Sequence, residues 1–418
     1  MRLLPTSLGR SFNGLWFGTG ASNLADGMAL FVLPLLALAI GASPGEVAAV
    51  TTALTLAWPL FGLHAGWIVD RVERRALLTG VSLARAAVLA GLTAAHLTGA
   101  LSIPLILLAA VLLGVAETLV DTALTSTIPR VVAPEARNRA NARVEATINV
   151  TNQLAGPPLA GLLAATTLAL ATGAGAVLYV LAVAGILAMT LSPGPAGPDV
   201  TEPRRGALVA GLRHLWRQPV VRTLTLYTAV MNVVWAAATA LLVVYAVAPG
   251  PLGLSTAQYG LLLTAMAVGG LLASMVVEPL RRRFGVTTLL IADAAGTVLL
   301  VLPVAVGASA WAVAAGAVVA GAGASVWRIL VATIRQNLSP PELLGRVYAA
   351  SRVISWGVLP PGAAVAGLIA EVWGVRTAFA VATVLALAVM AAFLRYALRT
   401  DLSAAAGTPH RDLLLPGG

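Results

Sequence analysis

Residues 146–198 read ATINVTNQLAGPPLAGLLAATTLALATGAGAVLYVLAVAGILAMTLSPGPAGP, and none of them is charged. A helix needs about 20 mainly apolar residues to cross the hydrocarbon core of a bilayer. The stretch is therefore long enough for two crossings, and we expect the Gly-rich segment Ala171–Gly175 to separate them. The sequence predicts a membrane-spanning helical hairpin in this part of the chain.

The composition of the whole chain points to the same environment. Of its 418 residues, 59% are apolar and 10% are charged, and the mean hydropathy is +0.92. Soluble domains contain roughly 45–50% apolar and about 25% charged residues, so these values exclude soluble, disordered and secreted scaffold proteins. Cysteine is absent and no HExxH or Walker-type motif occurs, which argues against thiolate metal sites, metalloproteases and nucleotide-driven pumps. We expect no enzyme activity, no metal and no cofactor.

Further apolar stretches raise the expected number of membrane crossings to twelve. Residues 223–277 are also uncharged and are divided at Pro249–Gly253, which predicts a second hairpin. Eight mainly apolar runs predict one helix each: residues 12–40, 47–69, 77–97, 102–128, 286–306, 309–334, 350–370 and 376–395. The predicted fold is an all-α membrane protein with twelve transmembrane helices.

The 26 basic residues, all of them arginine, predict the orientation of the chain. Twenty-two of them lie in the termini or in every second connection between predicted helices. Of the other four, Arg376 lies in an opposite connection, and three lie within predicted spans: Arg85, Arg328 and Arg352. Cytoplasmic loops carry such an excess of arginine and lysine. We therefore expect a multi-pass protein of a bacterial inner membrane with both termini in the cytoplasm. We assign the net charge of +10 to these loops and expect no nucleic-acid partner.

The longest polar connection, Ser192–Arg222, lies midway along the chain and is rich in proline. It predicts four parts: an N-terminal six-helix bundle at residues 1–191, a cytoplasmic linker at 192–222, a C-terminal six-helix bundle at 223–396 and a cytoplasmic tail at 397–418. Matching residues indicate that the two bundles arose by duplication. Two sets recur at nearly the same displacement: Pro134, Glu135 and Arg139 as Pro341, Glu342 and Arg346, and Asp70, Arg74 and Arg75 as Glu278, Arg282 and Arg283.

Several segments resemble motifs of the major facilitator superfamily. Residues 66–75, GWIVDRVERR, resemble its signature GxLaDrxGrr between helices two and three, with Glu73 where glycine is usual. Residues 156–161, GPPLAG, are similar to the Gly-Pro antiporter motif of drug exporters, and residues 140–143 with 335–346 resemble the branch that contains enterobactin and macrolide exporters. The resemblance implies two pseudo-symmetric six-helix halves, a central binding cavity between them and transport by alternating access.

Two acidic residues lie near the middle of predicted spans: Asp26 and Glu117. An ionisable group at the centre of a bilayer costs about 2.5–3.5 kcal/mol on insertion scales, so it usually faces the protein interior and has a function. Low dielectric favours the neutral form of a carboxyl group, which can then bind and release a proton as access alternates. The alternative for Asp26 is that it only forms hydrogen bonds to neighbouring helices together with Asn23.

Glu117, Asp121 and Thr125 follow one another at helical spacing, so they share one helix face. We expect this polar face to line the substrate and proton cavity, and the alternative is that it packs against other helices. Helix kinks are expected at a set of Gly and Pro residues, for which close packing alone is an equal alternative: Gly156, Pro157, Gly161, Pro360 and Pro361.

Two groups of charges are predicted to close the cytoplasmic gate. The motif resemblance implies that Asp70 pairs there with basic groups such as Arg71 and Arg74, although membrane orientation alone would also explain the arginines. In addition, the repeat displacement relates the acids of one half to bases of the other: Asp121 to Arg328, and Glu145 to Arg352. Facing halves would allow the cross pairs Asp121 with Arg352 and Glu145 with Arg328. Pairing within each half is the alternative.

Together these features predict a secondary transporter that exports an amphipathic small molecule, such as a drug, antibiotic or secondary metabolite, in exchange for protons. Its partners would be the substrate, protons and the lipid bilayer, and we expect it to act as a monomer. An importer or uniporter of the same fold remains an alternative, because topology does not determine direction. A membrane scaffold or receptor that does not transport is a second alternative, because a fold alone does not prove an activity.

The cross pairs make a first testable prediction. Charge reversal at one partner, Asp121→Arg or Arg352→Asp, should impair transport, and the double reversal should restore it because the attraction is re-formed with opposite signs. Transport in cells that lack other exporters measures the effect. A double variant that transports no better than either single variant would show that this pair does not form.

Overall fold

The computed structural model describes residues 8–189 and 205–407, apart from the side chains of Leu63, Asp70 and residues 205–208. Within these ranges the regular elements are helices, and none is a strand. The predicted all-α membrane fold is therefore confirmed. The first part of the predicted linker, up to residue 204, and the predicted tail beyond residue 407 lie outside the described residues.

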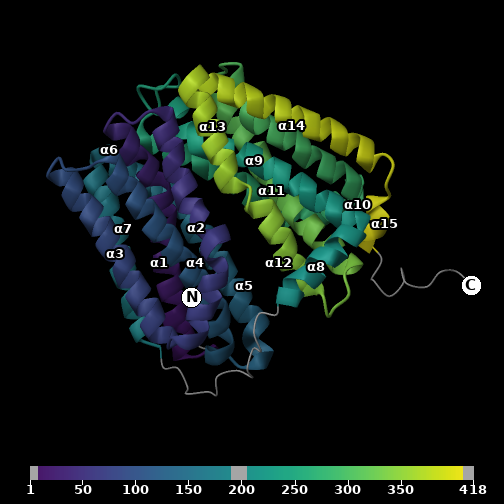
Figure 1. Cartoon of the computed structure of the whole chain (residues 1–418), viewed down its shortest axis with the longest axis horizontal. Helices are drawn as coiled ribbons and strands as arrows, with labels where there is room; N and C mark the ends of the chain where they lie inside the picture. Colours follow the sequence, from purple (N-terminus) through teal and green to yellow (C-terminus); the bar gives the residue numbers. More distant parts are fainter. Residues whose placement is uncertain (1–7, 190–204, 408–418) are drawn as a thin grey trace, which may run out of the picture. The chain divides into compact units, whose positions relative to one another are not determined.

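The chain divides into two compact units (Figure 1). The N-terminal unit contains Met1–Asp199 and Ala246–Thr264, and the C-terminal unit contains Val200–Tyr245 and Ala265–Gly418. The helices of the N-terminal unit are α1 (Arg10–Ala39), α2 (Pro44–Arg71), α3 (Arg74–Leu97), α4 (Ile103–Val131), the short 3₁₀ turn η2 (Pro134–Ala136), α5 (Arg137–Ile148), the π-helical η3 (Asn149–Ala155), α6 (Gly156–Thr166) and α7 (Leu168–Leu187). The predicted four-part division of the chain stays a prediction.

The remaining helices begin with α8, which occupies much of the predicted linker. They are α8 (Arg205–Arg217), α9 (Pro219–Ala246), α10 (Thr256–Ala305), α11 (Ala310–Leu338), α12 (Leu344–Trp356), α13 (Leu359–Trp373), α14 (Val375–Ala397) and α15 (Leu402–Gly407). Gly285 has a φ of 77° inside α10, a value that side chains other than glycine disfavour, so α10 consists of two helical parts that meet there. The second part of α10, α11 and α14 surround much of the core of the C-terminal unit.

Nine helices of the described residues are long and apolar enough to cross a membrane. One of the nine is α10, which covers the second arm of the predicted hairpin 223–277 and nearly all of the predicted span 286–306. The predicted total of twelve crossings is not established by these lengths and stays a prediction.

The first predicted hairpin divides at a different residue from the one expected. Ala171–Gly175 was the expected break, but it lies inside α7, and the helices separate at Thr167. The extended backbone of Thr167 ends α6, and its hydroxyl accepts a hydrogen bond from the Leu170 amide at 3.0 Å, which caps the start of α7. Glycine in an apolar membrane helix therefore served packing, whereas a capping threonine determined the break.

Small residues allow α1 and α7 to approach until their backbones touch. A Cβ atom added to Gly185 of α7 would lie 2.7 Å from the Gly18 nitrogen and 2.8 Å from the Gly14 oxygen of α1. Helices in a membrane associate through such small-residue contacts, because lipid offers no hydrophobic driving force between them. α7 also packs against α3, where the hydroxyls of Thr93 and Thr172 share a hydrogen bond of 2.7 Å. The contacts place α1, α3 and α7 side by side (Figure 1).

This close contact predicts a strong effect of one methyl group. Gly185→Ala should destabilise the transmembrane bundle by about 1–3 kcal/mol, because the added carbon meets backbone that cannot move aside. Gly91→Ala is the matched control, since nothing lies within 4 Å of a Cβ at Gly91 in α3 and alanine favours helix. Thermal unfolding of the purified protein in detergent should show a lower midpoint for the first variant only. Equal midpoints would contradict the packing.

Candidate functional site

A buried ion pair joins α1 and α3 in the N-terminal unit. Arg85 Nη2 lies 3.1 Å from Asp26 Oδ1, and Arg85 Nη1 donates to Asp26 Oδ2 at 3.4 Å and to Ser22 Oγ at 3.1 Å. From α7, the Tyr179 hydroxyl donates to Asp26 Oδ1 at 2.6 Å, and its ring centre lies 5.1 Å from the Arg85 guanidinium carbon. We call Ser22, Asp26, Arg85 and Tyr179 the Asp26 cluster.

The Asp26 cluster is almost completely removed from solvent. Arg85 and Tyr179 are each 1% exposed and Asp26 is 8% exposed. Desolvation of two charges costs several kcal/mol per ion, and it is offset only when the partners are close and their remaining hydrogen bonds are made. Both oxygens of Asp26 are bonded here, whereas Arg85 Nε has no hydrogen-bond partner among the described residues. The bonds from Arg85 and Tyr179 to Asp26 link α3 and α7 to α1.

Two further acids of α4 belong to the same electrostatic neighbourhood. Glu117 interacts with Asp26, Arg85 and Asp121, and Arg85 in turn interacts with Asp121. Glu117 is half-buried, whereas Asp121 and Thr125 are exposed. The Thr125 hydroxyl donates to the Thr122 carbonyl of its own helix at 2.8 Å. Arg85 is thus bonded to one carboxyl group, that of Asp26, and lies within electrostatic reach of two more, those of Glu117 and Asp121.

Asn23 does not extend this network. Its side-chain amide donates to the Thr19 carbonyl at 3.0 Å, within α1 itself. Asp26, by contrast, does bond to neighbouring helices, as the structural alternative for this residue predicted. A structural contact and a proton-binding role are compatible in one carboxyl group, so the role of Asp26 stays a prediction.

The first gate motif is described except for the side chain of Asp70, which lies outside the described residues. Arg71 stacks over the Trp67 ring at 4.2 Å, and the buried Arg74 donates through Nε to Ser126 Oγ of α4 at 3.3 Å. Glu73, which stands where the superfamily signature has glycine, caps α3 by accepting hydrogen bonds from two amides of its first turn, those of residues 75 and 76. Its backbone is extended, so the turn needs no glycine.

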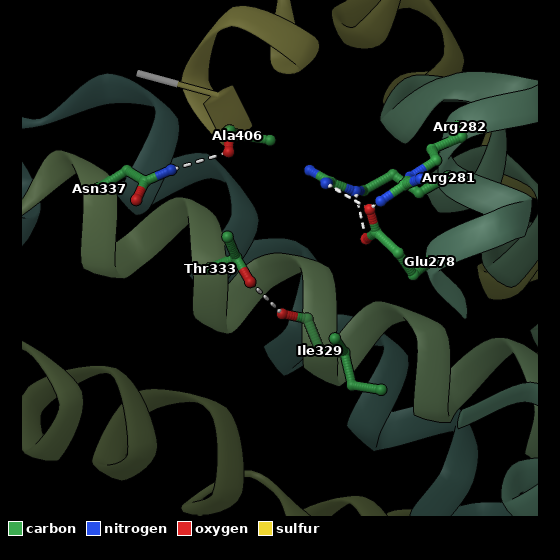
Figure 2. Close-up of polar contacts among 7 residues, drawn as sticks. All are labelled: Glu278, Arg281, Arg282, Ile329, Thr333, Asn337 and Ala406. Atoms are coloured by element: carbon green, nitrogen blue, oxygen red, sulfur yellow. Dashed lines mark hydrogen bonds and ion pairs between the residues drawn. The ribbon is translucent and has the colours of Figure 1, made fainter. Parts of the chain in front are cut away.

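The equivalent segment of the C-terminal unit forms a fork of charges (Figure 2). Glu278 accepts hydrogen bonds of 3.0 Å from Arg281 Nε, Arg281 Nη2 and Arg282 Nε. Exposed pairs of this kind contribute little stability. Figure 2 also shows Asn337 of α11, whose side-chain amide donates a hydrogen bond to the Ala406 carbonyl at 2.8 Å. This bond links α15 to α11.

Two residues of the proposed cross pairs, Glu145 and Arg352, have contacts within their own units. Glu145 accepts a hydrogen bond of 3.4 Å from the Asn149 amide, and the Arg352 guanidinium lies 4.7 Å from the centre of the Trp356 ring. Arg328 is exposed on α11. The cross pairs stay a prediction.

The Gly-Pro motif coincides with a change of helix type. The α-helical hydrogen bonding of α5 gives way to π-helical η3, and α6 begins at Gly156 with Pro157 in its first turn. Proline lacks an amide proton and is tolerated in this position. In the C-terminal unit, α12 ends at Trp356 and Pro360 lies in the first turn of α13, followed by Pro361. Gly161 of α6 accepts a hydrogen bond at its carbonyl from the Thr256 hydroxyl at 3.3 Å.

Comparison with known proteins identifies the family of the chain. The model of a major facilitator family described as "transmembrane secretion effector" matches residues 6–413. The chain belongs to this family. It is a multi-pass membrane transporter of the MFS type, and the more specific resemblance to enterobactin and macrolide exporters stays a prediction.

Individual relatives agree with this assignment. The transporter is 29% identical over 358 residues to the uncharacterized MFS-type transporter y4rN of Sinorhizobium fredii (strain NBRC 101917 / NGR234), which covers 83% of this chain and 85% of y4rN. The crystal structure of the nucleoside transporter NupG has a TM-score of 0.74 at 12% identity and covers 94% of this chain and 100% of its own. A bacterial homologue of the iron transporter ferroportin has a TM-score of 0.68 at 18% identity and covers 93% of this chain and 98% of its own. At these identities the solved structures show the fold alone.

Sequence reasoning found Asp26 but missed the residues that hold it. Arg85 was recognised only as an arginine within a predicted span, and Ser22 and Tyr179 were not singled out. For Arg85 a signal existed: a base deep in an apolar run needs an acid, and few acids lie at similar depth. Tyr179 carried no such signal, because tyrosine is common in membrane helices.

The ion pair of the transporter yields a stability prediction. Arg85→Met removes the only base bonded to Asp26 among the described residues and leaves a buried carboxylate, so the free energy of unfolding should fall by about 3–5 kcal/mol. The double variant with Asp26→Asn should recover part of the loss. Arg399→Met is a matched control at an exposed position. Unfolding midpoints in detergent measure the effect, and equal midpoints for Arg85→Met and Arg399→Met would contradict it.

Proposed function

We propose that the transporter exports an amphipathic small molecule, such as a drug, an antibiotic or a secondary metabolite, in exchange for protons. The observation that carries this proposal is the excess of acids around Arg85 in the N-terminal unit. Three carboxyl groups, those of Asp26, Glu117 and Asp121, act on one guanidinium. In a membrane, ionised carboxyl groups that lie close together repel one another strongly, and a carboxyl group lowers that cost by binding a proton.

Arg85 gives the acids a means of exchange. When Asp26 is ionised, the guanidinium is held by the two short contacts of the Asp26 cluster. Protonation of Asp26 removes the attraction and leaves Arg85 to interact with Glu117 and Asp121. The side chain thus has two sets of partners, and proton binding selects between them. A two-state element of this kind is what coupled transport requires.

Two features support export and an amphipathic substrate. The family description names secretion, and residues 156–161 are similar to the Gly-Pro motif of drug exporters. The helices that carry the acids, α1 and α4, are otherwise apolar, and each is long and apolar enough to cross a membrane. A substrate with apolar surface and a polar or cationic group would match such surroundings.

Inside-out membrane vesicles with an acidic interior test the proposal, with ethidium as the amphipathic probe. The wild-type transporter should accumulate ethidium, and a protonophore should abolish the accumulation. Asp26→Asn and Glu117→Gln should each lower proton-driven accumulation at least tenfold, because neither side chain can then carry a proton. Ethidium exchange without a gradient should persist in at least one variant, which would separate coupling from binding.

Glu135→Gln is the matched control for loss of a carboxyl group, since Glu135 is exposed in η2. Its accumulation should equal that of the wild type. Accumulation that survives the protonophore would exclude proton coupling. Movement of a substrate only toward the cytoplasm would identify an importer, movement that stops at equal concentrations would identify a uniporter, and full cellular function of both variants would favour a scaffold.

A further inference from the structure

A second acid lies deep in the C-terminal unit, and the proposed function does not use it. Asp293 is in the second part of α10 and is only 2% exposed. Thr297, one helical turn later, is also 2% exposed. Among the residues that the structure describes, neither Asp293 Oδ2 nor Thr297 Oγ1 has a hydrogen-bond partner. Two unpartnered oxygens on one face of a buried helix are unusual, because nearly all buried polar groups are bonded.

The surroundings of Asp293 are apolar and closely packed. On α10 its buried neighbours in sequence are Leu290 and Ala294, and both belong to the core of the unit with Val326 of α11. α11 covers the carboxyl group directly, because a Cβ atom added to Gly323 would lie 2.7 Å from Asp293 Oδ1. Water therefore has little access from the side of α11.

No charged group compensates Asp293 within the described residues. Titratable side chains of the neighbouring helices include Tyr227 of α9, Arg328 and Arg335 of α11, and Tyr396 of α14. None of the four has an electrostatic interaction with Asp293. The contrast with Asp26 is direct, since that carboxyl is held by a guanidinium and a phenol. An isolated carboxylate in an apolar interior costs so much that the group takes up a proton instead.

We propose that Asp293 is a proton-binding site of the C-terminal unit, separate from the Asp26 cluster, and that Thr297 receives the hydrogen bond of the protonated acid. Side chains four residues apart on a helix lie side by side, so a change of rotamer brings the carboxyl and hydroxyl groups together. The proton satisfies Asp293, and its hydrogen bond satisfies Thr297 Oγ1. One bound proton thus removes both unpartnered oxygens.

Among the described residues, Thr297 is the one polar side chain in the lining of a small pocket whose other lining residues are apolar: Val230, Met231, Val234, Ala294, Ala386, Val389 and Met390. This lining offers no further side-chain oxygen ligand beside Asp293 and Thr297. A metal ion is a poorer occupant than a proton, because hard cations need about six oxygen ligands and Asp293 and Thr297 together present three side-chain oxygens. No group of three acids or histidines that could hold a metal occurs in the described part of the chain.

Infrared spectroscopy of the purified protein in lipid tests the site without a substrate. A protonated carboxylic acid has a carbonyl band separate from the carboxylate bands. We expect such a band at neutral pH, shifted by ¹³C-labelled aspartate in the wild type, retained in Asp26→Asn and lost in Asp293→Asn. Thr297→Val keeps the shape but removes the hydroxyl, so the band should move to higher frequency as its hydrogen bond is lost.

The outcomes of this experiment decide the proposal. A label-sensitive band that is as intense in Asp293→Asn as in the wild type, or no label-sensitive band in the wild type at any pH at which the protein is folded, would overturn it. If Asp293→Asn does not fold, the labelled Asp26→Asn variant still tests whether an aspartate other than Asp26 carries the proton. Stabilisation of the wild type by sodium ions that is absent in Asp293→Asn would instead identify a cation site.

A second readout rests on the proposed function, because it requires coupled transport. In the ethidium assay, Asp293→Asn should lower the number of protons moved per ethidium by at least one, while some proton-driven accumulation remains. An unchanged ratio would show that the Asp293 proton is not exchanged during transport. Since the infrared band is measured without transport, a failure of the exporter proposal leaves that test intact.

Discussion

The pairing of Asp26 with Arg85 is the constraint on which the N-terminal unit depends. Each charge lies where water cannot compensate it, so each requires the other, and the two helices that carry them must stay in one register. Tyr179 can reach Asp26 only because α7 lies directly against α1. The backbone contact at Gly185 provides that approach. The close packing of small residues between α1 and α7 therefore supports the hydrogen bond that Tyr179 donates to the buried Asp26.

The two units share a repeat pattern in sequence but treat buried acid differently. In the N-terminal unit a base neutralises the deepest acid, and surplus acids lie beside the pair. In the C-terminal unit no base among the described residues interacts with Asp293, and Arg328 of α11 is exposed. The buried acids of the two units thus have different surroundings. Under the proposals made above, the two units would bind protons with different affinity, which a symmetric pair could not do.

Much of this organisation could be predicted from the sequence, because the cost of burying charge in a membrane is large and local. The spans and Asp26 follow from that cost. The partners of Asp26 do not, because they lie on helices far apart in the chain and depend on tertiary contacts. The helix break at Thr167 was missed since glycine is a weak breaker in apolar surroundings. Asp293 was missed although it stands in the middle of the predicted span 286–306, where the criterion applied to Asp26 would have identified it.

The choice of arginine at residue 85 limits where the exchangeable protons can be. A guanidinium remains charged at any physiological pH and presents several donors in one plane, so Arg85 contacts both oxygens of Asp26 and the Ser22 hydroxyl at once. Lysine has a single nitrogen and could not hold these partners in the same geometry. Because Arg85 keeps its proton, any proton that this site gains or loses must belong to the carboxyl groups. In the proposed exchange the arginine is the permanent charge for which the acids compete, and the protonation of Asp26 would decide the partner of Arg85.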